Sequence, residues 1–185
     1  MSKSEHSNSR RSFILLLAAF IIPVVLAKFA LTQQWFNYGV TNLGELIETP
    51  LTLADVGIEA PKTKQWLVIY SLPQECNKRC QHTLLGVQNS YFALGRETPR
   101  VTPIALTHSS VNLEQIKQLD ARHWQVISAP AHVATELSSS KVYIADPLGN
   151  IIISYQQPIS ENEVPSFGKA MLSDLKKLLK YSRIG

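Results

Sequence analysis

The stretch that decides the fold is WLVIYSLPQECNKRCQHTLLGVQNSYFAL, residues 66–94, in which an apolar run leads into a loop that carries both cysteines of the chain. The run 66–70 is rich in β-branched and aromatic residues, which predicts a buried strand of a covered sheet. Pro73 helps to end that strand. From Cys80 onward, apolar residues recur every three or four positions, which predicts an amphipathic helix that begins between Cys76 and Cys80.

The two cysteines are therefore expected at a helix N-terminus, where unpaired N–H groups and the helix dipole favour negative charge. Lys78 and Arg79 lie between them and also favour the thiolate. One helical turn can place both sulfurs on one face, close enough for a disulfide or a shared metal ion. Because neither a C-x-x-C pair nor a second cysteine pair occurs, the pattern favours a soft Cu(I) site or a transient disulfide. A structural disulfide and two unconnected thiols are the alternatives.

The N-terminal part predicts a membrane segment. Residues 1–12 are polar and positively charged, and an apolar run of bilayer-spanning length follows over 13–31. This charge distribution predicts a cytoplasmic N-terminus and a domain on the outer side. Val25-Leu26-Ala27 would also suit a signal peptidase, and Arg10-Arg11 resembles a twin-arginine signal. We favour an uncleaved anchor because the apolar character continues past the possible cleavage site.

An exported domain changes how the cysteines are interpreted. Disulfides persist outside the cytoplasm, so metal binding by this pair requires a thiol reductant in the same compartment. The net charge of +4 comes partly from the N-terminal tail and is otherwise spread along the chain. We therefore expect no nucleic-acid partner.

Beyond the cysteines, the chain predicts a parallel arrangement. The long helix ends around Gly95. Val101–Leu106 and Trp124–Ile127 are expected strands, and Ser110 or Asn112 caps a short helix between them. Strand, helix, strand, helix and strand in this order predict parallel strands joined by right-handed crossovers.

Both ends of this domain add further strands. Short strands are expected over 45–47 and 51–53. The apolar runs 141–145 and 151–155 flank Asp-Pro-Leu-Gly-Asn, which is typical of an antiparallel hairpin. A last helix, opened by Pro165, is expected to pack on the sheet. The order of elements matches a thioredoxin-like layout.

The segments YSLPQECNKRC, VTPIAL and VYIADPLGNIIISY, followed by a C-terminal helix, resemble the Sco/SenC family. That family comprises membrane-anchored copper chaperones and thiol–disulfide proteins of cytochrome c oxidase assembly. The resemblance implies an α/β, thioredoxin-like three-layer fold with a central mixed sheet, preceded by one N-terminal transmembrane helix. We expect a cytoplasmic tail over 1–12, an anchor over 13–31, a linker over 32–42 and the Sco-like domain over 43–185.

The resemblance also implies a function in respiratory cytochrome c oxidase biogenesis. Cys76 and Cys80 would act as a Cu(I) chaperone site or as a thiol–disulfide redox pair, and any enzyme activity would be that of a thiol–disulfide oxidoreductase. Expected partners are the bacterial inner membrane, an oxidase subunit or assembly factor, and a periplasmic thiol reductant. The alternatives are a thioredoxin-fold disulfide exchanger and a non-catalytic, oxidase-associated protein that binds no copper.

The chain departs from the family at its distal histidine, whose place is taken by Ser138. His108 follows an expected strand at the sheet edge where sites of α/β proteins gather, and is one candidate ligand. His132, in a loop that could fold over the cysteines, is the other. His82 lies about 200° around the helix from Cys80 and is expected to face solvent.

Overall fold

The computed structural model describes residues 5–32, 42–59, 64–107, 123–128, 137–138 and 140–182. The chain forms two compact units, Met1–Thr41 and Asn42–Gly185. The short helix expected after Ser110 or Asn112 lies outside the described residues, and so do His108 and His132. The expected boundaries at residues 12, 31 and 42 stay predictions.

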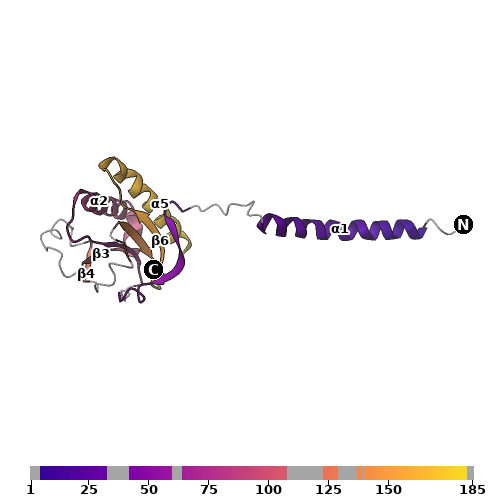
Figure 1. The fold of residues 1–185 in the computed structure, drawn as a ribbon, viewed down its shortest axis with the longest axis horizontal. Coiled ribbons are helices and arrows are strands. Elements are labelled where there is room, and N and C mark those ends of the chain that lie inside the picture. The colour runs from indigo at the N-terminus through magenta and orange to yellow at the C-terminus, as the bar shows by residue number, and fades with distance from the viewer. Residues whose placement is uncertain are drawn as a thin grey trace. The chain divides into compact units, whose positions relative to one another are not determined.

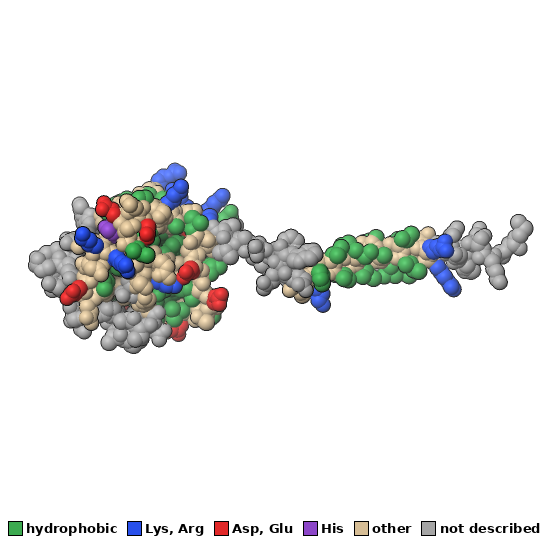
Figure 2. Space-filling view, turned by 45° about the horizontal axis from the view of Figure 1, so that its top comes forward, with side chains coloured by type: hydrophobic (Ala, Val, Ile, Leu, Met, Phe, Trp, Pro, Cys, Tyr) green, Lys and Arg blue, Asp and Glu red, His purple; other side chains and the backbone are tan. Residues whose placement is uncertain are grey.

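The first unit is built on one long helix, α1 (Glu5–Thr32). Its stretch Arg10–Ala30 is long and apolar enough to cross a membrane. Figure 2 shows hydrophobic side chains along most of this helix and basic side chains toward its two ends. A helix satisfies its own backbone hydrogen bonds, which is what a segment within lipid requires. The helix is therefore consistent with a single-pass membrane anchor, and it extends into the polar residues before the apolar run.

The second unit is organised around a six-stranded sheet in the order β1-β6-β5-β2-β3-β4 (Figure 1). Strands β2, β3 and β4 are parallel to one another. Strand β5 is antiparallel to both β2 and β6, and β6 is antiparallel to β1. The expected central mixed sheet is thus confirmed. Its strands are β1 (Glu45–Thr52), β2 (Trp66–Ser71), β3 (Val101–Thr107), β4 (Gln125–Ser128), β5 (Lys141–Ala145) and β6 (Asn150–Gln156).

Strand β2 lies inside the sheet, between β3 and β5, and all of its residues are buried. Val68 and Tyr70 belong to the core on one face, whereas Leu67 and Ile69 belong to the core on the other. Alternate residues of a strand point to opposite faces, so both faces of this strand are covered. This explains why its sequence is continuously apolar instead of alternating.

Helices α2 (Lys78–Phe92) and α5 (Val164–Tyr181) pack together on one face of the sheet (Figure 1). A Cβ atom on Gly86 of α2 would lie 2.6 Å from a ring carbon of Phe167 on α5. The Ser90 hydroxyl donates to the carbonyls of Gly86 and Gly168, over 2.7 and 3.0 Å. Small residues therefore permit the close approach of the two helices. Their contact holds α2, and with it the end of the cysteine loop, against the sheet.

Two short 3₁₀ helices complete the described elements. The first, η1 (Gly95–Arg100), connects α2 to β3, and the second, η2 (Glu161–Glu163), precedes α5. Gly95 has a φ of +59°, a conformation that favours glycine and ends α2 close to the expected place.

Strand β1 corrects the expectation of two separate short strands. It is one strand whose register against β6 shifts between Leu46 and Leu51. Pro50 lies in the bulge between these residues and has no N–H for a ladder hydrogen bond. The two expected pieces, 45–47 and 51–53, correspond to the paired ends of this single strand.

The first described residues of the second unit are fixed to α5 by one buried carboxylate. Asp174 Oδ2 accepts hydrogen bonds from the N–H groups of Leu43 and Gly44, at 2.7 and 3.0 Å, and from the Tyr155 hydroxyl at 2.9 Å. Asp174 is completely buried, and Lys177 Nζ lies 3.4 Å from its Oδ1. Buried carboxylates require such partners because desolvation of a charge is costly.

Candidate redox site

Cys76 and Cys80 are joined by a disulfide, with their Cα atoms 5.1 Å apart. Cys76 lies in the loop before α2, whereas Cys80 lies in the first turn of that helix. The Cα separation is within the range that disulfides usually span. The bond therefore forms because one of the two cysteines remains outside the regular helix.

Asn77 fixes the start of α2. Its side-chain Oδ1 accepts a hydrogen bond from the N–H of Cys80 at 3.2 Å, so it acts as the N-cap. The N–H of Gln81 donates to the Asn77 carbonyl at 3.0 Å, which begins the helical ladder. The Asn77 side chain thus positions Cys80 by a hydrogen bond to the backbone N–H of Cys80.

The two sulfur-bearing residues differ in exposure. Cys80 is 1% exposed and belongs to the core between the sheet and its two helices. Cys76 is only partly buried at the edge of the same core. Because a thiolate must reach the sulfur that it attacks, this asymmetry makes Cys76 the accessible half of the disulfide.

Tyr70 of β2 belongs to the same buried core as Cys80. Its side chain is completely buried, and its hydroxyl makes no well-formed hydrogen bond with the residues that the structure describes. Burial raises the pKa of Tyr70 to about 12, and the neighbouring Thr83 hydroxyl opposes this shift. The Tyr70 hydroxyl therefore stays protonated at neutral pH.

The described histidines do not join the cysteines. His82 is partly exposed, and its Nδ1 is buried without a hydrogen-bond partner in the described chain, so the residue faces solvent only in part. The position of His82 around the axis of α2 shows that it does not point to the same side as Cys80. It does not determine which other segments of the chain cover the histidine. His123 packs its ring against Tyr91 and Phe92, with centroids 5.8 and 4.9 Å apart, at the opposite end of α2.

Ser138, the residue in place of the family's histidine, is exposed and precedes β5. Its hydroxyl lies 2.7 Å from that of Ser140, and its N–H donates to the Tyr143 hydroxyl at 3.1 Å. Strand β5 is antiparallel to β2, with Val142 opposite Tyr70. The turn before β5 therefore lies at the sheet edge from which the cysteine loop leaves β2.

Within the described residues, the candidate metal ligands are the sulfurs of Cys76 and Cys80. Among residues 5–32, 42–59, 64–107, 123–128, 137–138 and 140–182, no group of three or more His, Cys, Asp or Glu side chains could hold an ion. In the disulfide state neither sulfur is a thiolate. After reduction, two adjacent thiolates fit Cu(I), which accepts soft ligands and low coordination. Copper binding and a ligand role for His108 or His132 stay predictions.

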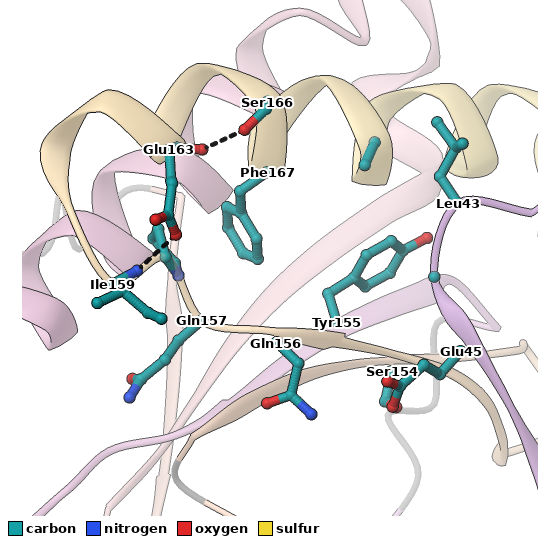
Figure 3. A pocket seen from close by; sticks show the side chains of 13 residues that line it. Leu43, Glu45, Ser154, Tyr155, Gln156, Gln157, Ile159, Glu163, Ser166 and Phe167 are labelled. Carbon is teal, nitrogen blue, oxygen red and sulfur yellow. Dashed lines mark hydrogen bonds between the residues drawn. The ribbon is translucent and has the colours of Figure 1, made fainter.

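A separate pocket of about 390 Å³ lies between β1, β6 and α5 (Figure 3). Tyr155 and Phe167 line it, with ring planes nearly perpendicular at 89°. On its rim, Glu163 accepts the N–H of Ile159 at 2.9 Å, and the Ser166 hydroxyl donates to the Glu163 carbonyl at 2.8 Å. Its lining includes neither cysteine, so it does not belong to the redox site.

Sequence reasoning missed two side chains that build this domain, Asn77 and Asp174. The signal for Asn77 was its place directly before an amphipathic helix, where Asn is a preferred cap. The signal for Asp174 was a carboxylate three residues after Met171 and directly before Leu175, on the apolar face of the last helix. A charge at such a position indicates a buried partner.

Several solved structures are similar to this chain. Copper-bound ScoI of Bradyrhizobium japonicum has 15% sequence identity and a TM-score of 0.45, with 61% of this chain and 84% of that chain covered. Yeast Sco1 has 14% identity and a TM-score of 0.48, with coverages of 64% and 81%. A SCO1/SenC family lipoprotein of Bacillus anthracis has 11% identity and a TM-score of 0.48, with coverages of 77% and 98%.

These three structures bear the names of Sco proteins, the family that the sequence resembles. Comparison with curated proteins gives no match. The family model described as "Transmembrane-like, thioredoxin-like, C-terminal domain" matches residues 66–182, the segment from β2 to the end of α5. Because this match spans more than half of the chain, the protein belongs to the family of transmembrane-like, thioredoxin-like C-terminal domains.

Proposed function

We propose that this protein is a membrane-anchored thiol–disulfide redox partner, and that its Cys76–Cys80 disulfide exchanges with a thiol outside the cytoplasm. The observation that carries the proposal is the asymmetric burial of the pair at the start of α2. A structural disulfide gains little from closing so short a loop. A disulfide with one accessible sulfur and one protected sulfur is instead suited to exchange.

The exchange proceeds in two balanced steps. An external thiolate attacks Sγ of Cys76, a mixed disulfide forms, and Cys80 leaves as a thiolate that takes up a proton. A second external thiolate then attacks the external sulfur of the mixed disulfide, which releases Cys76 as a thiolate. Two external thiols are oxidised to one disulfide, and the Cys76–Cys80 disulfide is reduced to two thiols.

The start of α2 favours this chemistry. Backbone N–H groups at a helix N-terminus and the helix dipole stabilise a thiolate there. The first turn of α2 contains no acidic residue that would oppose this effect. The departing Cys80 is held in place by the hydrogen bond from its N–H to Asn77.

Thiol trapping on the full chain in neutral detergent tests this function. We expect no alkylation before reduction, two alkylated cysteines after reduction, and an unchanged far-UV circular dichroism spectrum. A Cys80→Ser variant should form a mixed disulfide through Cys76, whereas the matched Cys76→Ser variant should react much more slowly through buried Cys80. Loss of the folded spectrum upon reduction would show that the disulfide is structural.

The second candidate function is Cu(I) delivery in cytochrome c oxidase biogenesis, with an oxidase subunit or assembly factor as the recipient. It is favoured by the adjacent soft sulfurs of Cys76 and Cys80. Cys76 and Cys80 would hold the ion after reduction by a periplasmic thiol, with His108 or His132 as the candidate third ligand. In this proposal α1 spans the bacterial inner membrane once, with its N-terminus in the cytoplasm.

Copper uptake by the reduced chain distinguishes the two functions. An anaerobic competition assay should give one Cu(I) per chain, lost in a Cys76→Ser/Cys80→Ser variant. His108→Ala and His132→Ala should be measured beside each other, because the loss of a third ligand would lower the Cu(I) affinity in only one of the two variants. Ser138→His should strengthen Cu(II) binding, since Cu(II) prefers nitrogen donors. If the reduced chain has two free thiols but binds no copper, the copper-delivery function is excluded and only the redox function remains.

A further inference from the structure

The surface beside Cys76 carries positive charge. Lys78 and Arg79 are the first two residues of α2, and both are exposed. Neither has an ion-pair partner within the part of the chain that the structure describes. Glu75 is the one acidic residue in the sequence 74–81. The positive end of the helix dipole adds to these side chains.

Any thiol that attacks the disulfide must approach this surface, because Cys80 is 1% exposed and Cys76 is the accessible sulfur. Lys78 and Arg79 follow Cys76 by two and three residues in the sequence, so their Cα atoms lie within about 11 Å of the Cys76 Cα atom. That distance is comparable to the Debye length, which is about 10 Å at 0.1 M ionic strength. Charges that a partner carries beside its own cysteine are thus within electrostatic reach.

We propose that the thiol partner of this site is a protein whose reactive cysteine is flanked by acidic residues, which Lys78 and Arg79 attract. This inference rests on the proposed thiol–disulfide function and specifies its substrate class. The attacking group is itself an anion, and the two basic side chains favour its encounter with Cys76. Acidic neighbours increase the attraction, whereas basic neighbours reverse it.

Two cysteine peptides of equal length test the proposal, one with aspartates and one with lysines on both sides of the cysteine. Each is mixed at equal thiolate concentration with the oxidised full chain in neutral detergent, and acid-quenched samples are analysed by mass spectrometry. A small neutral disulfide serves as the reference for the intrinsic reactivity of each peptide. After this correction we expect the acidic peptide to react about tenfold faster at low salt. The ratio should approach one at high salt, where charges are screened.

Charge reversal identifies the residues responsible. Lys78→Glu/Arg79→Glu should invert the preference, and Lys78→Gln/Arg79→Gln should bring the ratio near one. Glutamate is favoured in the first turn of a helix, so the reversed variant retains a suitable start for α2. The matched control is Lys176→Glu/Lys180→Glu, which makes the same charge change at exposed positions of α5. Arg100, directly before β3, donates to the Leu179 carbonyl, so this control lies toward the opposite sheet edge.

The outcomes separate this inference from the function on which it depends. Equal corrected rates for the two peptides, or an equal change in the α5 control, would overturn the acidic-partner inference and leave thiol exchange intact. If neither peptide reacts with the folded chain while both react with urea-unfolded chain, the proposed function itself fails.

Discussion

The hydroxyl of Tyr155 on β6 donates a hydrogen bond of 2.9 Å to the buried carboxylate of Asp174 on α5. The same Oδ2 atom accepts the N–H groups of Leu43 and Gly44. One side chain of the last helix thus joins a strand and the segment that leads into β1. The carboxylate is stable in the core because these donors replace the water that it loses.

Replacing Asp174 with alanine should lower the free energy of unfolding by about 3 kcal/mol or more, because three donors lose their acceptor. Urea denaturation followed by tryptophan fluorescence would measure the change. Tyr155→Phe removes one of the three hydrogen bonds and should cost about 1–2 kcal/mol. A larger effect of Tyr155→Phe than of Asp174→Ala would contradict this description of the cluster.

The fold should become less stable at alkaline pH because its buried tyrosines resist ionisation. Burial raises the pKa of Tyr70 to about 12, and burial together with the Asp174 hydrogen bond raises the pKa of Tyr155 further. A pKa that is higher in the folded state stabilises the fold below the unfolded pKa, which is about 10 for tyrosine. This stabilisation is lost as pH rises from about 10 through the folded-state pKa. For Tyr70 alone it amounts to about 2–3 kcal/mol.

Absorbance of tyrosinate measured alongside unfolding from pH 9 to pH 12 would check this sign. The control is Tyr181→Phe, since Tyr181 is 78% exposed and its removal should leave the pH dependence unchanged. Tyr155→Phe should weaken the pH dependence. Constant stability across this window would rule out the buried-tyrosine explanation.

The N-cap residue of α2 is expected to affect both the stability of the fold and the redox equilibrium of the cysteine pair. Asn77→Ala should lower the free energy of unfolding by about 1 kcal/mol, because the N–H of Cys80 loses its acceptor. Asn77→Asp keeps an acceptor at this position and should retain most of the stability. The equilibrium constant between the Cys76–Cys80 disulfide and glutathione should also shift in Asn77→Ala. It should not shift in Asn77→Ser, which retains a capping oxygen. Identical equilibria in all three variants would show that the cap has no influence on the cysteine pair.

We expect α1 to remain in the mature protein as a membrane anchor. If α1 remains uncleaved, the mature chain should retain its N-terminus and stay with membranes after a carbonate wash. Protease added to the outer side should remove the cysteine domain and leave a fragment that contains Arg10–Ala30. A mature N-terminus that begins at Lys28 would instead identify a cleaved signal.

The sequence predicted the elements that depend on local patterns. The apolar run of β2, the cysteines at the start of α2 and the turn at Asp146 were each recognisable, and the fold class derived from them is confirmed. The turn forms because Asp146 Oδ1 accepts the N–H groups of Leu148 and Asn150, both at 2.9 Å. Such contacts act between near neighbours, so sequence patterns can reveal them.

Contacts between distant segments were not predictable in this way. The bond between Leu43 and Asp174 joins residues far apart in the sequence, and no periodicity indicates which donor a buried carboxylate will meet. The partial burial of His82 was not predictable for the same reason, since the angle of a residue around a helix does not determine which other segments cover it.

The edges of the sheet have a consequence for crowding in the plane of a membrane. Chains tethered by α1, as proposed, would meet one another at a high local concentration, where open strand edges can pair between copies. Strand β1 limits this pairing by its bulge and by Pro50, and β4, at the other edge, is only four residues long. These two edge strands therefore disfavour edge-to-edge pairing between copies that share a membrane patch.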